Sequence, residues 1–139
     1  MSTRSFALIF GIVFLAIGAL GFVPGVVQPL HPGHPPVAGN GGQLLGLFPI
    51  NELHNGVHLL FGLWGLMASR SLGGAVLYAR GVAIVYGVLT IAGFVPNLDT
   101  MFGLVPLFGN DIWLHGAIAL VSAYFGWAHR SPVEGGSIA

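Results

Sequence analysis

Four long stretches of the chain are almost entirely apolar, and polar, Pro-rich or Gly-rich segments separate them. The stretches cover residues 5–23, 51–69, 75–95 and 112–129. Each approximates the ~20 residues that an α-helix needs to cross ~30 Å of hydrocarbon. None shows the single wet face of a soluble helix or the alternation of a strand. Because lipid leaves the backbone no other way to satisfy its hydrogen bonds, this pattern predicts four transmembrane helices.

The composition strengthens that prediction and removes several chemistries. The chain has 139 residues, of which 55% are hydrophobic and 6% are charged, whereas soluble domains carry roughly 25% charged residues. Because there is no cysteine, disulfides and thiolate metal sites are excluded. The formal net charge of +0 offers no basic surface to a nucleic acid. We therefore expect one membrane domain, residues 1–139, whose first partner is the lipid bilayer.

The arginines predict how the helices are oriented. If the helices alternate in direction, Arg4, Arg70, Arg80 and Arg130 all fall on one side. The positive-inside rule then places both termini in the cytoplasm. Although the start of the chain loosely fits a signal peptide, we expect the first stretch to be a retained helix. The connection across 24–50 is rich in Pro and Gly, which predicts an irregular, surface-lying and partly polyproline-like loop.

Two sequence patterns occur twice in the chain. Gly21-Phe22-Val23-Pro24 recurs as Gly93-Phe94-Val95-Pro96, and Gly46-Leu47-Phe48-Pro49 recurs as Gly103-Leu104-Val105-Pro106. The recurrence predicts two hairpins of the same orientation, at about 5–70 and 75–130. Such parallel repeats are usually related by a pseudo-two-fold axis along the membrane normal. The predicted fold is therefore an all-α, four-helix transmembrane bundle made of two parallel hairpin repeats.

The displacement of the second pattern, 57 residues (103 minus 46), places His54 opposite Asp111 and His58 opposite His115. Ionisable groups inside a membrane span face protein or water, and small residues let helices approach closely. We therefore expect the second and fourth helices to meet, with these four side chains in one cluster near the outer surface. Small residues continue each helix face below the cluster: Gly62, Gly65 and Ser69 on one, and Ala119, Ser122 and Gly126 on the other.

The cluster has several chemical interpretations. We favour a structural network without a cofactor, in which Asp111 accepts a hydrogen bond from an imidazole and Asn55 completes the network. Alternatively, the four side chains could hold a metal ion, because imidazole suits Zn, Cu or Fe. A third interpretation is a tetrapyrrole, with His58 and His115 flanking a haem or each binding the magnesium of a chlorophyll.

Other polar residues lie around the predicted cluster. Glu52 and Asn110 are placed at its rim, although Glu52 also fits an exposed residue of the first helical turn, where the helix dipole favours an acid. His31 and His34 could bind a metal at the outer surface, but a solvated loop is the expected environment of both.

Two motifs resemble those of a known family. They are Leu53-His54-Asn55-Gly56-Val57-His58-Leu59-Leu60-Phe61-Gly62, and Val105-Pro106-Leu107 followed by Asn110-Asp111-Ile112-Trp113-Leu114-His115. Together they are similar to the signatures of a small bacterial membrane family, the domain of unknown function 4383. The resemblance implies a four-helix protein integral to the bacterial cytoplasmic membrane. It implies no activity.

The function expected from these observations is not catalytic. No serine is expected within the cluster, and no paired carboxylates share a helix face. The many glycines and small residues favour an accessory or structural subunit that packs against other membrane helices or copies of itself. The alternative is a membrane protein that binds a metal or a tetrapyrrole through His54, His58, Asp111 and His115.

Overall fold

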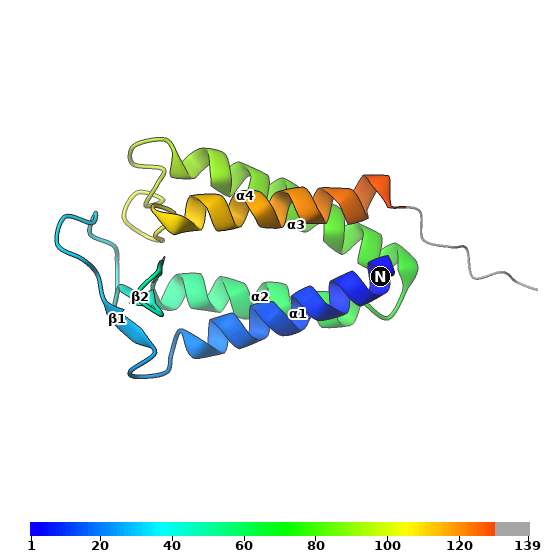
Figure 1. Cartoon of the computed structure of the whole chain (residues 1–139), viewed down its shortest axis with the longest axis horizontal. Helices are drawn as coiled ribbons and strands as arrows, with labels where there is room; N and C mark the ends of the chain where they lie inside the picture. Colours follow the sequence, from blue (N-terminus) through cyan, green and yellow to red (C-terminus); the bar gives the residue numbers. More distant parts are fainter. Residues whose placement is uncertain (130–139) are drawn as a thin grey trace, which may run out of the picture.

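The computed structural model describes residues 1–129, which are mostly helical (Figure 1). Its α-helices are α1 (Thr3–Leu20), α2 (Glu52–Ala68), α3 (Leu72–Gly93) and α4 (Asn110–Ala123), and a π-helix, η1 (Tyr124–Ala128), continues α4. These bounds lie within a few residues of the predicted stretches. By length and composition, α1 and α3 are apolar enough to cross a membrane. The predicted end of the second repeat at residue 130, and Arg130 itself, lie outside the described residues.

Polar residues directly before three helices determine where those helices begin. The side chains of Ser2, Asn51 and Ser71 accept hydrogen bonds from backbone N–H groups in the first turns of α1, α2 and α3. Such caps satisfy donors that the helix itself leaves free. Helix α4 instead follows Gly109, whose φ of 67° is one that L side chains rarely adopt.

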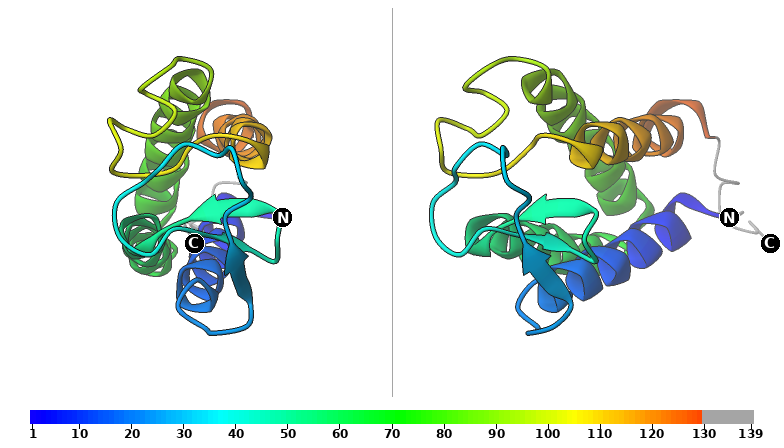
Figure 2. Two further views of the ribbon diagram at one scale, coloured as in Figure 1. Left: turned by 90° about the vertical axis from the view of Figure 1, so that its left-hand side faces the viewer. Right: turned by 60° about the vertical axis from the view of Figure 1, so that its left-hand side comes forward.

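A small sheet replaces part of the expected irregular loop, so the prediction of an all-α chain is wrong at this point. Strands β1 (Val27–Pro29), β2 (Gly42–Leu44) and β3 (Phe48–Ile50) pair antiparallel in that order. The sheet lies across one end of the bundle, here called the sheet end (Figure 2). The tight β2–β3 turn is possible because Leu45 and Gly46 adopt φ values of 54° and 69°. Sequence pattern misses such strands because three residues are too few to show alternation.

The helices form two hairpins, α1 with α2 and α3 with α4 (Figure 1). Glycines allow the first pair to approach closely: a Cβ added to Gly62 would lie 2.8 Å from the backbone nitrogen of Leu15, and one added to Gly65 would lie 2.7 Å from Gly11 Cα. The expectation that Gly62 and Gly65 face the fourth helix is therefore wrong. The two glycines instead bring α2 against α1, its antiparallel neighbour along the chain.

The other predicted packing residues also have different neighbours. Ser69 ends α2, and its carbonyl accepts a hydrogen bond of 2.9 Å from Arg4 Nε. Gly126 faces α3, because an added Cβ would lie 2.9 Å from Arg80 Cγ. Ala119 packs against the aromatic core described below, and Ser122 is fully buried. The small residues of α2 and α4 thus contact the neighbouring helix of their own hairpin or the aromatic core, rather than forming a direct contact between α2 and α4.

Aromatic rings fill the space between the hairpins and form what we call the aromatic core. Its members are Phe6, Phe14, Tyr78, Tyr86 and Phe125, all buried. Phe6 of α1 stacks on Phe125 of η1 with ring centroids 4.6 Å apart, and Phe14 of α1 lies 5.4 Å from Tyr86 of α3. Each aromatic side chain buries a large apolar area. The hairpins are therefore held together chiefly by ring packing over most of their length.

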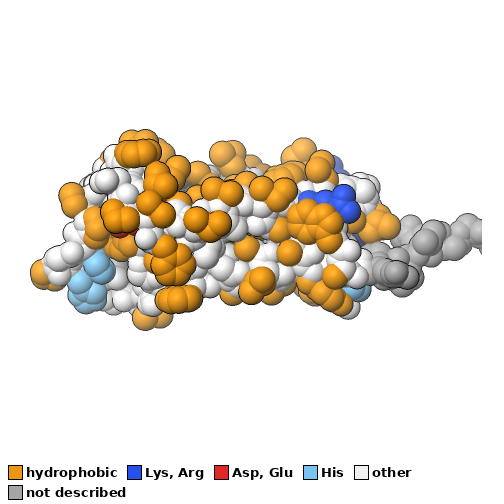
Figure 3. Space-filling model, turned by 90° about the horizontal axis from the view of Figure 1, so that it is seen from above, with side chains coloured by type: hydrophobic (Ala, Val, Ile, Leu, Met, Phe, Trp, Pro, Cys, Tyr) orange, Lys and Arg blue, Asp and Glu red, His pale blue; other side chains and the backbone are white. Residues whose placement is uncertain are grey.

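The outward surface of all four α-helices is apolar. Leu60 of α2, Ile91 of α3 and Leu120 of α4 are 67%, 68% and 75% exposed, and Ile12 of α1 is also exposed. Figure 3 shows hydrophobic side chains along the body of one face, with arginine confined to the end opposite the sheet end. An apolar surface this extensive is unfavourable in water.

Candidate metal centre

Three buried histidines from the two hairpins meet at the sheet end. One ring nitrogen of each of His54, His58 and His115 lies within 4.8 Å of the others. His54 and His58 are one turn apart on α2, with ring centroids 4.6 Å apart, and the ring of His115 on α4 lies 6.0 Å from that of His54. We call these three residues the histidine cluster. The structure thus brings together the positions that the 57-residue displacement paired.

Asp111 lies beside the cluster and contacts one of its members. Its Oδ2 is 3.7 Å from His54 Nδ1, and both side chains are buried. This separation suits an ion pair but is too long for a hydrogen bond. Asp111 is not one of the residues whose ligand atoms converge within the cluster. Asp111 therefore contacts His54 but is not a fourth member of the histidine cluster.

The hydrogen-bond network expected in the cluster is not present in the described part of the chain. Within residues 1–129, Nδ1 of His54, His58 and His115 and Oδ2 of Asp111 are buried without a hydrogen-bond partner. Asn55, expected to complete the network, points to the end of α1, where a Cβ on Gly21 would collide with its amide. The reason is geometric, because one residue along a helix turns the side chain by about 100° away from His54.

Unpartnered buried polar atoms are costly. Each costs roughly 1–3 kcal/mol when it is desolvated without a hydrogen bond, so their presence in a native structure calls for an explanation such as an ion or a functional role. Neighbouring rings restrict how the imidazoles can turn. Tyr86 meets the ring of His115 nearly edge-on, at 5.0 Å and 80°, and Phe14 lies 5.5 Å from the ring of His58. The imidazoles are thus held close together in an apolar enclosure.

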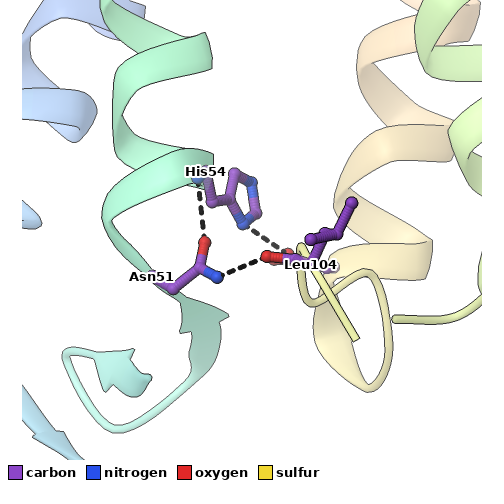
Figure 4. Close-up of polar contacts among 4 residues, drawn as sticks. Asn51, His54 and Leu104 are labelled. Atoms are coloured by element: carbon purple, nitrogen blue, oxygen red, sulfur yellow. Dashed lines mark hydrogen bonds and ion pairs between the residues drawn. The ribbon is translucent and has the colours of Figure 1, made fainter. Parts of the chain in front are cut away.

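Asn51 fixes the start of α2 against the second hairpin. Its Oδ1 accepts a hydrogen bond of 2.9 Å from the backbone N–H of His54, and its Nδ2 donates to the carbonyl of Leu104 at 2.7 Å (Figure 4). The same Nδ2 donates to the carbonyl of Ala38 at 3.0 Å. The sequence analysis did not single out Asn51. Its place as an Asn directly before an apolar helix is the signal that identifies a cap. Tyr86, which was also missed, gives no such signal within an apolar stretch.

A cavity of about 120 Å³ adjoins the histidine cluster. Besides the histidines and Tyr86, its lining residues are apolar: Val57, Leu89, Met101, Val105 and Leu107. Pockets for drug-sized ligands span roughly 300–1,000 Å³, and a tetrapyrrole is at least that large. A haem or chlorophyll ring therefore does not fit between these residues.

The predicted rim residues bind loops rather than the histidines. Glu52 is exposed, and its carboxylate accepts hydrogen bonds from the backbone and side chain of Asn40. Asn110 is also exposed, and its Nδ2 donates 3.1 Å to the carbonyl of Leu47. The alternative interpretation of Glu52, an exposed acid in the first turn of α2, is confirmed. The expectation that Glu52 and Asn110 form a second layer around the cluster is wrong, because each is directed to a connection at the sheet end.

His31 and His34 lie apart from the histidine cluster. Their rings are 5.9 Å from each other, and the ring of His34 is 5.1 Å from that of Phe108. Both line a second cavity of about 300 Å³, together with Gln43 and Asn110 among others. Among residues 1–129, the side chains that come together in a group of three able to hold a metal ion are those of the histidine cluster. The loop pair has no third ligand of that kind.

Comparison with known proteins gives a family and no activity. The family model described as "Domain of unknown function (DUF4383)" matches residues 4–128, which confirms the resemblance seen in the two motifs. The comparisons with curated proteins and with solved structures found no match.

Proposed function

The chain belongs to the DUF4383 family, and from its geometry we propose that it is a multi-pass membrane protein that binds a divalent transition-metal ion through His54, His58 and His115. One observation carries the proposal: three buried imidazoles converge, and within the described residues the Nδ1 atom of each has no hydrogen-bond partner. A bound cation would take one ring nitrogen of each imidazole, and on His58 and His115 the unpartnered Nδ1 atom is free for it. Neutral imidazole is a preferred ligand of Zn, Cu, Fe and Ni.

The separations suit an ion after a small adjustment. Three nitrogens bound tetrahedrally at ~2.0–2.1 Å to one ion lie about 3.4 Å apart, and the ligand atoms here lie within 4.8 Å of one another. Movements of the side chains by about 1.4 Å or less close that difference. Because His54 and His58 share one helix face and His115 comes from the other hairpin, binding would also join the two halves of the molecule.

Asp111 supports this proposal as a positioning residue. Histidine ligands usually donate their second ring N–H to a carboxylate or carbonyl, which fixes the tautomer and makes the ligand more basic. Asp111 Oδ2 lies 3.7 Å from His54 Nδ1, so a shift of roughly 0.5–1 Å on metal binding would form this hydrogen bond and leave Nε2 of His54 for the ion. A set of three histidines leaves a further coordination position free, as in zinc sites with an open position.

The membrane part of the proposal extends to α2 and α4. Their outward residues are as apolar as those of α1 and α3, so we place all four α-helices across the bilayer. Arg4, Arg70 and Arg80 at one end orient that end to the cytoplasm by the positive-inside rule. The histidine cluster then lies in the outer half of a bacterial cytoplasmic membrane. Packing against partner subunits or a second copy, and the absence of catalysis, stay predictions.

Metal content of the purified protein tests the proposal. Protein isolated from membranes in mild detergent and loaded with Co²⁺ should bind about one ion and show visible absorption typical of a nitrogen-ligated site. His58→Ala and His115→Ala should each lose that ion, whereas His31→Ala, a loop histidine outside the cluster, should keep it. Gel filtration checks that each variant remains folded. Wild-type protein that binds no Co²⁺, Zn²⁺ or Fe²⁺ would overturn the proposal.

Asp111→Asn separates the role of a positioning residue from that of a ligand. The amide keeps the shape of the side chain but removes its charge, so the metal dissociation constant should rise by ~10–100-fold while the stoichiometry is unchanged. Complete loss of binding would instead make Asp111 a direct ligand.

A further inference from the structure

The second cavity, of about 300 Å³ at the sheet end, differs in chemistry from the cavity beside the histidine cluster. Its walls offer polar and apolar surface in similar amounts, whereas the walls of the smaller cavity are almost wholly apolar. We infer that the second cavity binds a small organic molecule that carries one oxyanion group, a carboxylate or a phosphate. The inference does not depend on the proposed metal site, because none of the three cluster histidines lines this cavity.

One wall of the second cavity is the start of α4, where backbone donors are free. Gly109 and Asn110 line the cavity, and no side chain caps the helix. Within residues 1–129 the backbone N–H groups of Gly109 and Asn110 donate no hydrogen bond. Free N–H groups and the positive end of the helix dipole favour an anion. Asp111, the acid of the first turn, does not line the cavity, and its carboxylate lies against His54 instead.

The opposite wall holds a buried polar side chain that has no partner. Gln43 of β2 is 5% exposed and lines the cavity, and its Oε1 is buried without a hydrogen-bond partner in the described part of the chain. Its Nε2 is not buried in this way, so the amide N–H groups are the end of the side chain that a ligand can reach. An unpartnered buried carboxamide calls for an explanation, and an oxyanion in the cavity would accept from its Nε2.

The local structure holds these two walls in place. Gln43 lies directly opposite Pro49 in the β2–β3 pair, and both line the cavity. On the other side, Asn110 Nδ2 donates a hydrogen bond of 3.1 Å to the carbonyl of Leu47, which joins the start of α4 to the β2–β3 turn. A preformed cavity loses less entropy when a ligand binds than a flexible one. The donors are therefore arranged before any ligand enters.

A histidine and apolar side chains complete the lining. His34 Nδ1 is buried, so Nε2 is the nitrogen of this imidazole that can donate to a ligand. The ring of His34 lies 5.1 Å from that of Phe108, which is 7% exposed. Phe108, Leu47 and Pro49 provide apolar surface beside the donors, and no Asp, Glu, Lys or Arg is among the lining residues. This combination suits an oxyanion attached to an apolar group.

The size and the mouth of the cavity indicate the kind of molecule. Its volume of about 300 Å³ is at the lower end of the roughly 300–1,000 Å³ of small-molecule sites, and a bare phosphate ion would leave most of it empty. His31, Leu47 and Asn110 are exposed lining residues, so the cavity opens at the sheet end rather than between the helices. A water-soluble molecule of about the size of benzoate fits these conditions.

Benzoate and phenyl phosphate are the probes for this site. They are titrated into the full chain in an uncharged detergent, with a chelator and without phospholipid, and binding is measured by isothermal titration calorimetry. At least one of the two should bind at about one molecule per chain. Benzamide has the shape of benzoate without its charge and should bind at least ~tenfold more weakly than the anion.

A matched pair of glutamine variants locates the site. Gln43→Leu removes the buried amide donors and should lower the affinity for the anion at least ~tenfold. Gln28→Leu changes a glutamine of the neighbouring strand β1 that does not line the cavity, and it should bind as wild type. His58→Ala, which removes a ligand of the proposed metal site, should also bind the anion as wild type.

Three results would contradict the inference: no binding of either anion, equal binding of benzamide and benzoate, or unchanged affinity in folded Gln43→Leu. If Gln43→Leu does not fold, His34→Leu removes a donor from the same cavity and is judged in the same way. Native mass spectrometry of protein from bacterial membranes identifies the source of the oxyanion. A phospholipid that the wild type retains and Gln43→Leu loses would make the oxyanion a lipid phosphate.

Discussion

The two hairpins meet in two chemically different regions. Along most of their length the contact is the aromatic core, where Phe6 stacks on Phe125 and Phe14 packs against Tyr86. At the sheet end the contact consists of imidazoles and a carboxylate, and within residues 1–129 their Nδ1 and Oδ2 atoms lack hydrogen bonds. The first region gains free energy from its buried rings, with one unpartnered hydroxyl on Tyr78, whereas the second concentrates four unpartnered polar atoms that each cost free energy.

The aromatic core accounts for stability, and the unpartnered cluster is where the proposed function lies. Proteins tend to store unfavourable arrangements at functional sites, where stability is given up for activity or binding. Here the cluster is surrounded by rigid elements that prevent relaxation: the cap at Asn51, the small sheet, and the Tyr86 ring. Four experiments test the contrast between the two regions.

The largest effect is expected in the aromatic core. Phe6→Ala removes a fully buried ring and should lower the free energy of unfolding by ~3–5 kcal/mol. Thermal unfolding of the purified protein in detergent measures it. Leu8→Ala on the outward face of the same helix is the control, since Leu8 is exposed. Equal losses in both variants would mean that ring packing does not hold the hairpins together.

Metal addition should stabilise the protein through the histidine cluster alone. At a free Zn²⁺ concentration of 100 times the dissociation constant, the wild-type protein gains about 2.7 kcal/mol. His58→Ala should show no gain, and His31→Ala should show the full gain. A gain that survives in His58→Ala would place the ion elsewhere.

The cap at the sheet end should matter more than an ordinary helix cap. Asn51→Ala removes a cap and two bonds to other segments, so a loss of ~2 kcal/mol is expected. Ser71→Ala removes only a local cap hydrogen bond on α3, and a loss of ~0.5–1 kcal/mol is expected. The pair is compared by chemical denaturation. Equal losses would show that the bonds of Asn51 across the sheet end contribute nothing.

The smallest expected effect is a gain of stability rather than a loss. In chelator-treated protein, His58→Leu replaces an unpartnered buried polar group by an apolar one of similar size. It should raise the unfolding free energy by ~1 kcal/mol, while abolishing metal binding. The melting temperature with and without Zn²⁺ measures both effects. A clear loss of stability without metal would mean that His58 makes a structural contact that offsets its desolvation.

Parts of the site were predictable because they depend on helix periodicity. The spacing of four residues puts His54 and His58 on one face of α2, and the repeated pattern pairs them with Asp111 and His115. Local rules do not give the rotation of one helix about its axis relative to another. For that reason the partners of Asn55 and Gly62 were assigned incorrectly, since both face α1 instead of α4.

The sequence alone predicts that the chain forms apolar helices, their bounds to within a few residues, and which histidines share a face. Those properties follow from hydropathy, capping residues and a fixed helical pitch, all of which are local. Only the tertiary structure decided that small residues pack within each hairpin, that aromatic rings separate α2 from α4, and that a cavity adjoins the histidines. These features depend on how bulky side chains from distant segments fill a shared volume, and close packing has no signature in the sequence of any one segment.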